Sequence, residues 1–426
     1  MKSSWLSTIK FLPALPPLLE DIAADIVIIG GGLAGTLTSY LLAKEGKKVV
    51  VLEKKDITHS MTAYTTAWLS AAIDTDWWDL SEMYGNNGAK SIWKSHKEAI
   101  DIIEKIVEEE NIDCEFMRVS QFRYATNEDQ MENLKEEYEI AKLLDIAATL
   151  HEPSFLDFAN HGSLEIKNQA KFHPLKFLIA LRESATKLGV VFYENTEVEK
   201  LEDLEEGKKV LATSRHGSAE AEYSITTTYE PFDKPQELFA HKGSYKTYVL
   251  EATTSEETIA EGLYEDEQNP YHYLRVDKLE KENRIIFGGE DHRKEIPVPE
   301  EKNFESLILN LNKIIPSDKY TITKKWMGVI IETIDGLPYI GSYSKDHPRR
   351  LVATGFSGNG MTYSAISAQI LRDIILGKEN PYHDLYHAGR RTKIISLWKK
   401  FIDFSGEFFG YARNLYEARK TSHNKS

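Results

Sequence analysis

The stretch Asp25-Ile-Val-Ile-Ile-Gly-Gly-Gly-Leu-Ala-Gly35 joins a short apolar run to a cluster of glycines. Residues 36–44 then have helical spacing, and a second apolar run, residues 48–52, ends at Glu53. This order predicts a strand, a glycine turn, a helix and a second strand, with an acid about 20 residues after the glycines. The sequence therefore predicts a dinucleotide-binding α/β unit near the N-terminus.

Each residue of this motif has a physical task. Gly30 permits the tight turn, Gly32 lets a pyrophosphate approach the backbone, and Gly35 lets the helix pack closely on the strand. The N-terminus of the helix offers free N–H groups and the positive end of its dipole to the phosphates. Glu53 is expected to accept hydrogen bonds from both ribose hydroxyls of the dinucleotide.

The composition sets limits on the class of protein. The chain has 426 residues, a formal net charge of −15 and one cysteine, Cys114. The length predicts two domains, and the negative charge argues against nucleic acid as a partner because phosphate binding needs a basic face. One cysteine excludes a disulfide framework and an iron–sulfur cluster held by this chain alone, and no metal site is expected. Cys114 itself is expected to be a buried structural residue on a strand.

The rest of the chain alternates predicted helices and strands. A strand at residues 351–354 precedes a second glycine loop, Gly355-Phe-Ser-Gly-Asn-Gly-Met-Thr362, and a helix at about 363–376. The runs 271–276 and 284–287 predict a hairpin. Further helices are expected at 89–110, 128–150 and 173–188, the last entered at His173-Pro174, where His173 is expected to cap the helix or lie on the surface. No run of about 20 apolar residues predicts a membrane span, and the cytoplasm is the expected location.

With these segments in place, the chain resembles the D-amino acid oxidase family of FAD-dependent oxidoreductases over almost its whole length. The residues that carry the resemblance are 25–35, Val49-Val-Val-Leu-Glu53, Asp335-Gly-Leu-Pro-Tyr-Ile-Gly341, Val352-Ala-Thr-Gly-Phe356 and Gly360-Met-Thr362. More narrowly, it is similar to the bacterial branch that often carries a C-terminal Rieske iron–sulfur domain, through Ser4-Trp-Leu6, Thr65-Thr-Ala67, Phe172-His-Pro-Leu-Lys176 and Phe287-Gly-Gly-Glu290. No Rieske domain is expected in this chain.

The resemblance implies the α/β fold class with an α+β substrate domain. A glutathione-reductase-like FAD-binding Rossmann domain is expected to be interleaved with a mixed-sheet substrate domain. The expected segments are 1–111, 166–235 and 323–390 for the FAD-binding domain and 112–165 and 236–322 for the substrate-binding domain. Residues 391–426 are expected to form a C-terminal amphipathic helical segment, which is basic and could make weak contact with a membrane surface.

The resemblance also implies the residues that contact FAD. By family position, the loop Thr58–Trp68 lies beside the ribityl chain and the flavin, and the second glycine loop lies along the flavin ring. The expected contacts are Gly30, Gly32, Leu33, Ala34, Gly35, Glu53, Lys54, Ser60, Thr65, Thr66, Ala67, Val198, Thr228, Gly336, Gly355, Gly358, Asn359, Gly360, Met361 and Thr362.

The same loop bears on how FAD is attached. Some relatives bind FAD covalently through a His of this loop, and the branch tends to place a His where this chain has Tyr64. Other relatives use a Cys near the C-terminal glycine loop, where residues 357–359 contain none. The resemblance therefore implies noncovalent FAD, and His59 is expected to lie on the surface or beside the phosphates.

The implied reaction is oxidation of the C–N bond of an amine or amino acid by hydride transfer to the flavin, giving an imine that water hydrolyses. The electrons are expected to pass to dioxygen or to a separate carrier. On the predicted strand 271–276, Tyr271, Tyr273 and Arg275 share one face by period two and are the expected substrate-orienting residues. Arg275 is the first choice for a carboxylate anchor because a guanidinium binds carboxylate bidentately.

Two other functions remain open. A 2-hydroxy acid dehydrogenase or oxidase on the same fold would need a similar anchor and would release a keto acid without ammonia. A non-catalytic flavin-binding subunit would keep the cofactor motifs without turnover. Tyr245, Tyr248 and Trp326 are weaker candidates for the pocket wall, for which core packing is the favoured role.

Overall fold

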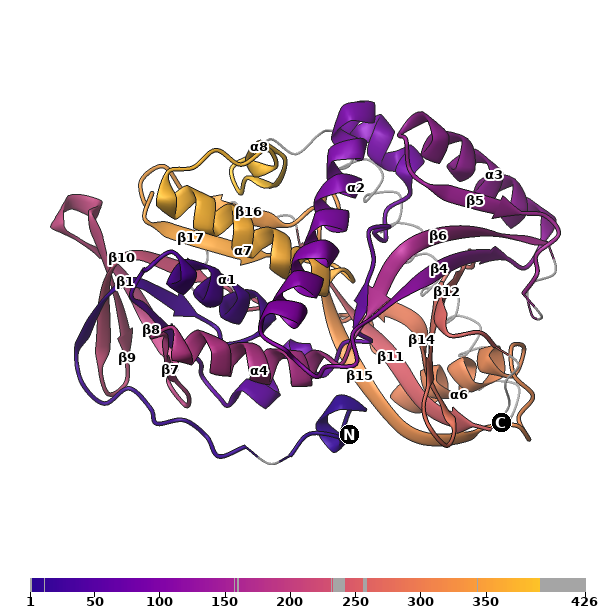
Figure 1. The fold of residues 1–426 in the computed structure, drawn as a ribbon, viewed down its shortest axis with the longest axis horizontal. Helices are drawn as coiled ribbons and strands as arrows, with labels where there is room; N and C mark the ends of the chain where they lie inside the picture. The colour runs from indigo at the N-terminus through magenta and orange to yellow at the C-terminus, as the bar shows by residue number, and fades with distance from the viewer. Residues whose placement is uncertain are drawn as a thin grey trace, which may run out of the picture.

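The computed structural model describes residues 2–10, 12–156, 158, 161–230, 232, 242–255, 259–342 and 344–390. The expected amphipathic segment 391–426 lies outside these residues. Two β-sheets organise the chain, and Figure 1 shows the first sheet with helices α1, α4 and α7 in one half of the molecule and the second sheet in the other. The predicted α/β fold class is confirmed.

The first sheet has the strand order β16-β17-β10-β1-β2-β7, and the four strands from β10 to β7 pair in parallel. Strand β17 is also parallel to β10, whereas β16 closes the edge in antiparallel orientation. Strands β8 and β9 extend β10 as an antiparallel arm. The bounds are β1 Ile22–Ile29, β2 Val49–Leu52, β7 Val191–Tyr193, β8 Val198–Leu204, β9 Lys209–Ser214, β10 Ser218–Thr226, β16 Tyr339–Ser342 and β17 Arg350–Thr354.

Apolar residues on β1 and β2 explain why this sheet is buried. Strand β2 is buried at every position, and β1 is buried from Ile26 onward, which is typical of parallel strands covered on both faces. Helix α1 packs against both α7 and α4. The helices are α1 Leu33–Lys44, α4 Pro174–Lys187, α7 Gly360–Leu376 and the short α8 His383–Tyr386.

The second sheet has the order β15-β11-β14-β13-β12-β4-β6-β3, with β5 paired to β6. The sheet is mixed, because β12 pairs in parallel with β4 whereas the other strand pairs of this sheet are antiparallel. The predicted hairpin is confirmed as β13 and β14. The bounds are β3 Trp68–Leu69, β4 Met117–Ala125, β5 Ala148–His151, β6 Gly162–Lys171, β11 Lys242–Thr254, β12 Gly262–Asp266, β13 His272–Lys278, β14 Asn283–Arg293 and β15 Thr321–Thr333, with α6 Glu300–Leu311 packed on β11 and β14.

Helix α2, Trp77–Glu109, starts earlier than the prediction of 89–110 and contains a break at Gly85, where φ is 72°. It contacts α7 of the first half and α3, Glu128–Leu143, of the second. The predicted helix 128–150 is wrong beyond residue 143. The chain turns at Asp145, where φ is 60°, and β5 then pairs with β6, so sheet pairing overrides the helical pattern.

Two local predictions near the start of β4 have different outcomes. Cys114 is buried, as expected, but it lies in a bend rather than on a strand, because pairing between β4 and β6 begins only at Met117. His173 caps α4, since its Nδ1 accepts a hydrogen bond from the N–H of Lys176 at 3.1 Å. No helix among the described residues combines the length and apolar character needed to cross a bilayer.

The two sheets use alternating parts of the chain, which bears on the domain boundaries. Strand β6 spans the expected boundary at 165–166 and β15 spans the one at 322–323, and both strands belong wholly to the second sheet. We propose that the FAD-binding domain follows the first sheet, and that both boundaries lie at the ends of these strands.

Candidate functional site

A cavity of about 760 Å³ is lined by residues from both sheets. The first wall is formed by the loops that follow β1, β2, β10 and β17, which are the carboxyl ends of the parallel strands. Open α/β sheets bind their ligands at this edge. The second wall comes mainly from the second sheet and contains Trp68, Asp74, Gln121, Thr247, Glu265, Tyr271 and Tyr273.

The glycine turn after β1 has the geometry that the motif requires. Gly30 has φ of 109°, which favours glycine, and a Cβ on Gly35 would lie 2.0 Å from the carbonyl oxygen of Gly30. A Cβ on Gly32 would instead meet nothing closer than 3.6 Å, although Gly32 lines the cavity. Gly35 is therefore needed for packing of α1 on β1, whereas Gly32 leaves room for a ligand against the backbone.

Glu53 lies at the end of β2 and lines the cavity. Its carboxylate accepts hydrogen bonds from the N–H of Gly31 at 2.8 Å and of Lys55 at 3.0 Å. These bonds hold the acid beside the glycine turn, where a ribose attached to the pyrophosphate would lie.

The loop Thr58–Trp68 forms two short 3-10 helices, η2 Ile57–His59 and η3 Met61–Ala63. Its Thr62 Oγ1 accepts a hydrogen bond from the N–H of Leu33 at 3.2 Å, which joins the loop to the start of α1. His59 lines the cavity, and its Nδ1 is 2.7 Å from Asp56 Oδ2 with the imidazole about half exposed. The hydroxyl-bearing residues Ser60, Thr62, Thr65 and Thr66 also line the cavity.

Three buried side chains fix the end of this loop. The indole N–H of Trp326 donates to the carbonyl of Tyr64 at 3.0 Å, and the indole N–H of Trp5 donates to that of Thr65 at 2.6 Å. Arg275 donates through Nη1 to the carbonyls of Thr66 and Ala67. The loop backbone is therefore held from behind while its hydroxyls face the cavity.

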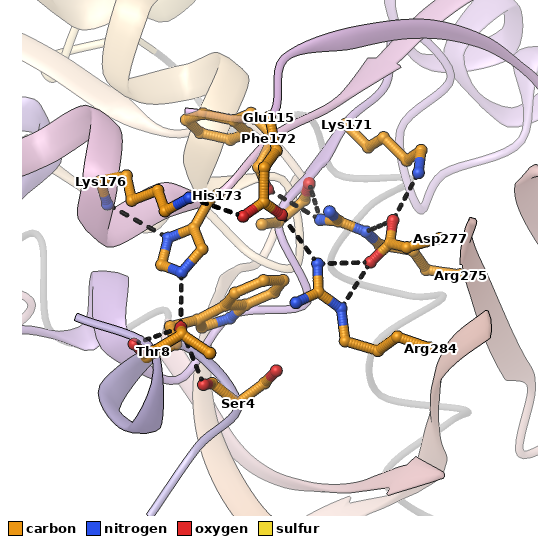
Figure 2. Close-up of polar contacts among 12 residues, drawn as sticks. Ser4, Thr8, Glu115, Lys171, Phe172, His173, Lys176, Arg275, Asp277 and Arg284 are labelled. Atoms are coloured by element: carbon orange, nitrogen blue, oxygen red, sulfur yellow. Dashed lines mark hydrogen bonds and ion pairs between the residues drawn. The ribbon is translucent and has the colours of Figure 1, made fainter. Parts of the chain in front are cut away.

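The expectation for Arg275 needs correction. Its side chain is 1% exposed and does not line the cavity. Figure 2 shows its guanidinium directed toward Asp277, whose carboxylate accepts from Nε at 2.9 Å, and Nη1 also donates to the carbonyl of Phe172 at 2.9 Å. The guanidinium further stacks on Trp5 at 5.0 Å. Because Nε and Nη1 are committed to this network and the side chain is enclosed away from the cavity, Arg275 is not placed to anchor a substrate carboxylate.

The network around Asp277 is dense. This carboxylate also pairs with Arg284 Nε at 2.8 Å and with Lys171, and Arg284 reaches Glu115 at 3.1 Å (Figure 2). The surrounding cations hold the pKa of Asp277 well below its usual range despite burial. The cluster is a buried structural unit behind the loop.

The second glycine loop closes the cavity against α7. Gly355 has φ of 77°, and the N–H of Gly358 donates to Asp74 Oδ2 at 2.9 Å. Helix α7 starts at Gly360 without a side-chain cap at Asn359, and a Cβ on Gly360 would meet nothing within 4 Å. The positive end of a 17-residue helix is therefore directed toward open space in the cavity wall.

The structure brings most of the expected cofactor residues to the cavity. Those that line it are Gly30, Gly32, Leu33, Ala34, Glu53, Lys54, Ser60, Thr65, Thr66, Val198, Thr228, Gly355, Gly358, Asn359, Gly360 and Met361. Gly35, Ala67, Gly336 and Thr362 do not line it. Gly35 packs α1, Ala67 accepts from Arg275, Gly336 forms a turn at φ of 76°, and the Thr362 hydroxyl lies 2.8 Å from His96 Nδ1.

Tyr271 and Tyr273 line the second wall, and their role in orienting a substrate stays a prediction. Trp68 ends the loop that was expected beside the flavin, whereas the residues that sequence reasoning missed there are Asp74, Gln121, Thr247 and Glu265. They come from separate strands and loops with no shared motif, so no local signal marks them. Tyr248 and Trp326 are fully buried and do not line the cavity, which agrees with core packing.

Burial and neighbouring carboxylates raise the pKa values of two residues in the second wall, Glu265 and Tyr271. Burial raises the pKa of Glu265 to about 8, and the nearby Glu267 and Asp74 carboxylates add to this while Arg123 opposes it. Burial and then the Asp74 carboxylate raise the pKa of Tyr271 well above its ordinary value. The phenol is therefore neutral at pH 7 and can donate a hydrogen bond.

No group of three or more His, Cys, Asp or Glu among the described residues is placed to hold a metal ion.

Comparison with known proteins agrees with this geometry. Residues 25–374 match the DAO family, described as FAD dependent oxidoreductase. The chain is 33% identical over 382 residues to YhfW, a Bacillus subtilis (strain 168) protein named for a Rieske 2Fe-2S iron–sulfur centre, covering 89% of this chain and 74% of that protein. It is 24% identical to gamma-glutamylputrescine oxidoreductase of Escherichia coli (strain K12), covering 86% of this chain and 87% of that one.

A solved structure shows the same fold. The glycine oxidase of Geobacillus kaustophilus superimposes with a TM-score of 0.74 at 17% identity, covering 87% of this chain and all of that one. The cavity also fits the cofactor that the family name states, because it joins a dinucleotide turn, an acid after β2 and an uncapped helix N-terminus. The chain therefore belongs to the DAO family of FAD-dependent oxidoreductases.

Proposed function

We propose that this protein oxidises the C–N bond of an amine or amino acid with noncovalently bound FAD. The observation that carries the proposal is one continuous cavity that runs from the dinucleotide turn at Gly30 to the phenols of Tyr271 and Tyr273. The names of gamma-glutamylputrescine oxidoreductase and glycine oxidase support a nitrogen-bearing substrate. FAD bound in this cavity would supply the hydride acceptor for the carbon beside the nitrogen, and water would hydrolyse the imine product.

The residues of this chain have distinct tasks in that reaction. The turn at Gly32 and the N-terminus of α1 hold the pyrophosphate, and Glu53 holds the ribose. The uncapped N-terminus of α7 favours negative charge in front of it. Tyr273 lies 2.8 Å from the Thr247 hydroxyl, which fixes the phenol in the second wall where it orients the substrate.

The route of the electrons after the substrate is oxidised is also a proposal. Dioxygen or a separate carrier takes them, and the Rieske name of the Bacillus subtilis relative favours a carrier. A separate carrier is supported if the rate of substrate oxidation under argon rises when ferricyanide is added as the electron acceptor. Little hydrogen peroxide should then form when the same reaction runs in air.

Product analysis separates the proposed function from its alternatives. Purified holoenzyme is mixed without oxygen with amines, amino acids and 2-hydroxy acids, and flavin absorbance near 450 nm is followed. Bleaching by a nitrogen compound with release of ammonia or an amine supports C–N oxidation. Bleaching by hydroxy acids alone favours the 2-hydroxy acid dehydrogenase, and no bleaching by any class favours a flavin-binding subunit.

The mode of FAD attachment gives a further prediction. Tyr64 stands where relatives can carry a linking His, Cys114 is buried away from the cavity, and His59 is paired with Asp56. We therefore expect acid precipitation of the holoenzyme to leave all yellow chromophore in the supernatant as FAD. Chromophore that remains on the polypeptide after gel filtration in denaturant contradicts noncovalent binding.

A further inference from the structure

The second wall contains a cluster of aromatic rings. The rings of Trp68 and Tyr273 meet edge to face at 6.1 Å, and those of Tyr271 and Tyr273 lie 5.8 Å apart. All of these residues line the cavity. Electron-rich ring faces attract cations, and groups of such rings recognise ammonium ligands.

Carboxylates accompany the rings. Glu265 and Asp74 line the same wall. Behind Thr247 lies Asp291, whose Oδ1 is buried and accepts no hydrogen bond from the described residues. The Asp74 carboxylate is a negative neighbour common to Glu265, Asp291 and both tyrosines, so these groups share one electrostatic environment.

Arg123 is the basic residue that contacts Glu265 in the part of the chain that the structure describes, and it is shared with other carboxylates. Gln121 Nε2 donates to Glu265 Oε1 at 3.0 Å, and Arg123 Nε lies 3.6 Å from the same oxygen. Arg123, however, forms shorter bonds with Glu267 at 2.8 Å and Asp76 at 2.7 Å. A single guanidinium is thus shared among several carboxylates. The Glu265 carboxyl is mainly protonated at neutral pH in the free protein, and a cationic group placed beside it would favour its ionised form.

Basic side chains are confined to the opposite side of the cavity. Among the described residues that line it, the basic ones are Lys54, Lys55 and His59, all in the segment after Glu53 where the nucleotide is placed. Arg275, which could have met a carboxylate, is enclosed behind the loop. A substrate carboxylate in the second wall would meet like charge without a cationic partner, which is unfavourable.

We propose that the substrate is a diamine or related polycation, with one nitrogen oxidised and a second, protonated nitrogen held by Glu265 and Asp74 within the rings of Trp68, Tyr271 and Tyr273. This inference rests on the proposed function and names the substrate class of the same site. It disfavours simple α-amino acids, whose carboxylate would lie beside Asp74 with no basic side chain among the described residues of the second wall.

A binding experiment tests the charge preference without turnover. Oxidised holoenzyme is titrated with tetramethylammonium chloride or sodium acetate at constant ionic strength, and the visible flavin spectrum is recorded. Tetramethylammonium is expected to perturb the spectrum saturably, and acetate is not. A saturable response to acetate, or none to tetramethylammonium, overturns the inference.

A variant of Glu265 tests whether this side chain binds the second nitrogen of the substrate. Glu265→Gln keeps an oxygen for Gln121, so the fold and FAD content should be preserved while residue 265 can no longer ionise beside a bound cation. We expect KM for 1,4-diaminobutane to rise roughly 10- to 100-fold, as for loss of a charge-assisted hydrogen bond, with KM for butylamine unchanged. Glu295→Gln, at an exposed position, is the matched control and should resemble the wild type. An unchanged KM for the diamine in a variant that retains FAD contradicts the role of Glu265.

The outcomes keep the two proposals apart. If α-amino acids bleach the flavin and diamines do not, the cationic substrate is wrong and C–N oxidation stands. If no nitrogen compound bleaches an intact holoenzyme, the proposed function fails, and the cationic substrate fails with it.

Discussion

Gly32→Ala should lower the affinity for FAD by roughly 10- to 100-fold while leaving the stability of the apoprotein unchanged. Gly32 has φ of −67°, which alanine adopts without strain, and its Cβ would meet no protein atom within 3.5 Å. The added methyl group therefore costs nothing in the apoprotein. It occupies the space in which the pyrophosphate approaches the backbone, so its cost of about 1–3 kcal/mol appears on binding.

Gly35→Ala provides the contrast within the same turn. Its Cβ would lie 2.0 Å from the carbonyl oxygen of Gly30, so α1 must move and the apoprotein itself should lose stability. Thermal unfolding of both apoproteins and FAD titration by flavin fluorescence measure the two effects separately. Equal FAD affinity in Gly32→Ala and the wild type contradicts the placement of the pyrophosphate at this turn.

Arg275→Met should destabilise the protein by about 3–5 kcal/mol, which lowers the melting temperature of a chain of this length by about 3–6 °C. The substitution leaves Asp277 with less compensation in a buried position and removes the donors to the carbonyls of Thr66, Ala67 and Phe172. Because two of these carbonyls belong to the cofactor loop, the variant should also lose FAD during purification.

The same variant distinguishes a structural role for Arg275 from that of a carboxylate anchor. An anchor would leave the melting temperature unchanged and raise only KM for substrates that carry a carboxylate. Arg215→Met, at an exposed turn, is the matched control and should melt like the wild type. A normally stable Arg275→Met protein with selective loss of carboxylate substrates contradicts the network in Figure 2.

The parts of the fold that sequence predicts well are those set by local constraints. Gly30 needs a positive φ, Gly35 has no room for a side chain, and Glu53 must end the second strand, so the motif fixes its own geometry. The helix after the second glycine loop is predictable for the same reason. The end of α3 was missed because Ala148–His151 pairs with β6, a contact that no local pattern reports.

The substrate side of the cavity could not be predicted because its residues meet only in the folded chain. The period of two correctly joins Tyr273 and Arg275 on one strand, yet Trp5 covers Arg275 while Tyr273 remains in the cavity. Glu265 gains its role from Gln121 on a neighbouring strand. Sequence periodicity assigns a face of a strand, and only tertiary packing decides which part of that face is open.

Anaerobic titration of the FAD holoenzyme with a single amine is the most direct test of C–N oxidation at this cavity. With 1,4-diaminobutane, the flavin absorbance should fall to that of the reduced form. One equivalent of aminoaldehyde and one equivalent of ammonia should appear for each equivalent of flavin reduced. Flavin that stays oxidised with every nitrogen compound supplied, in a protein that retains its FAD, would contradict the account.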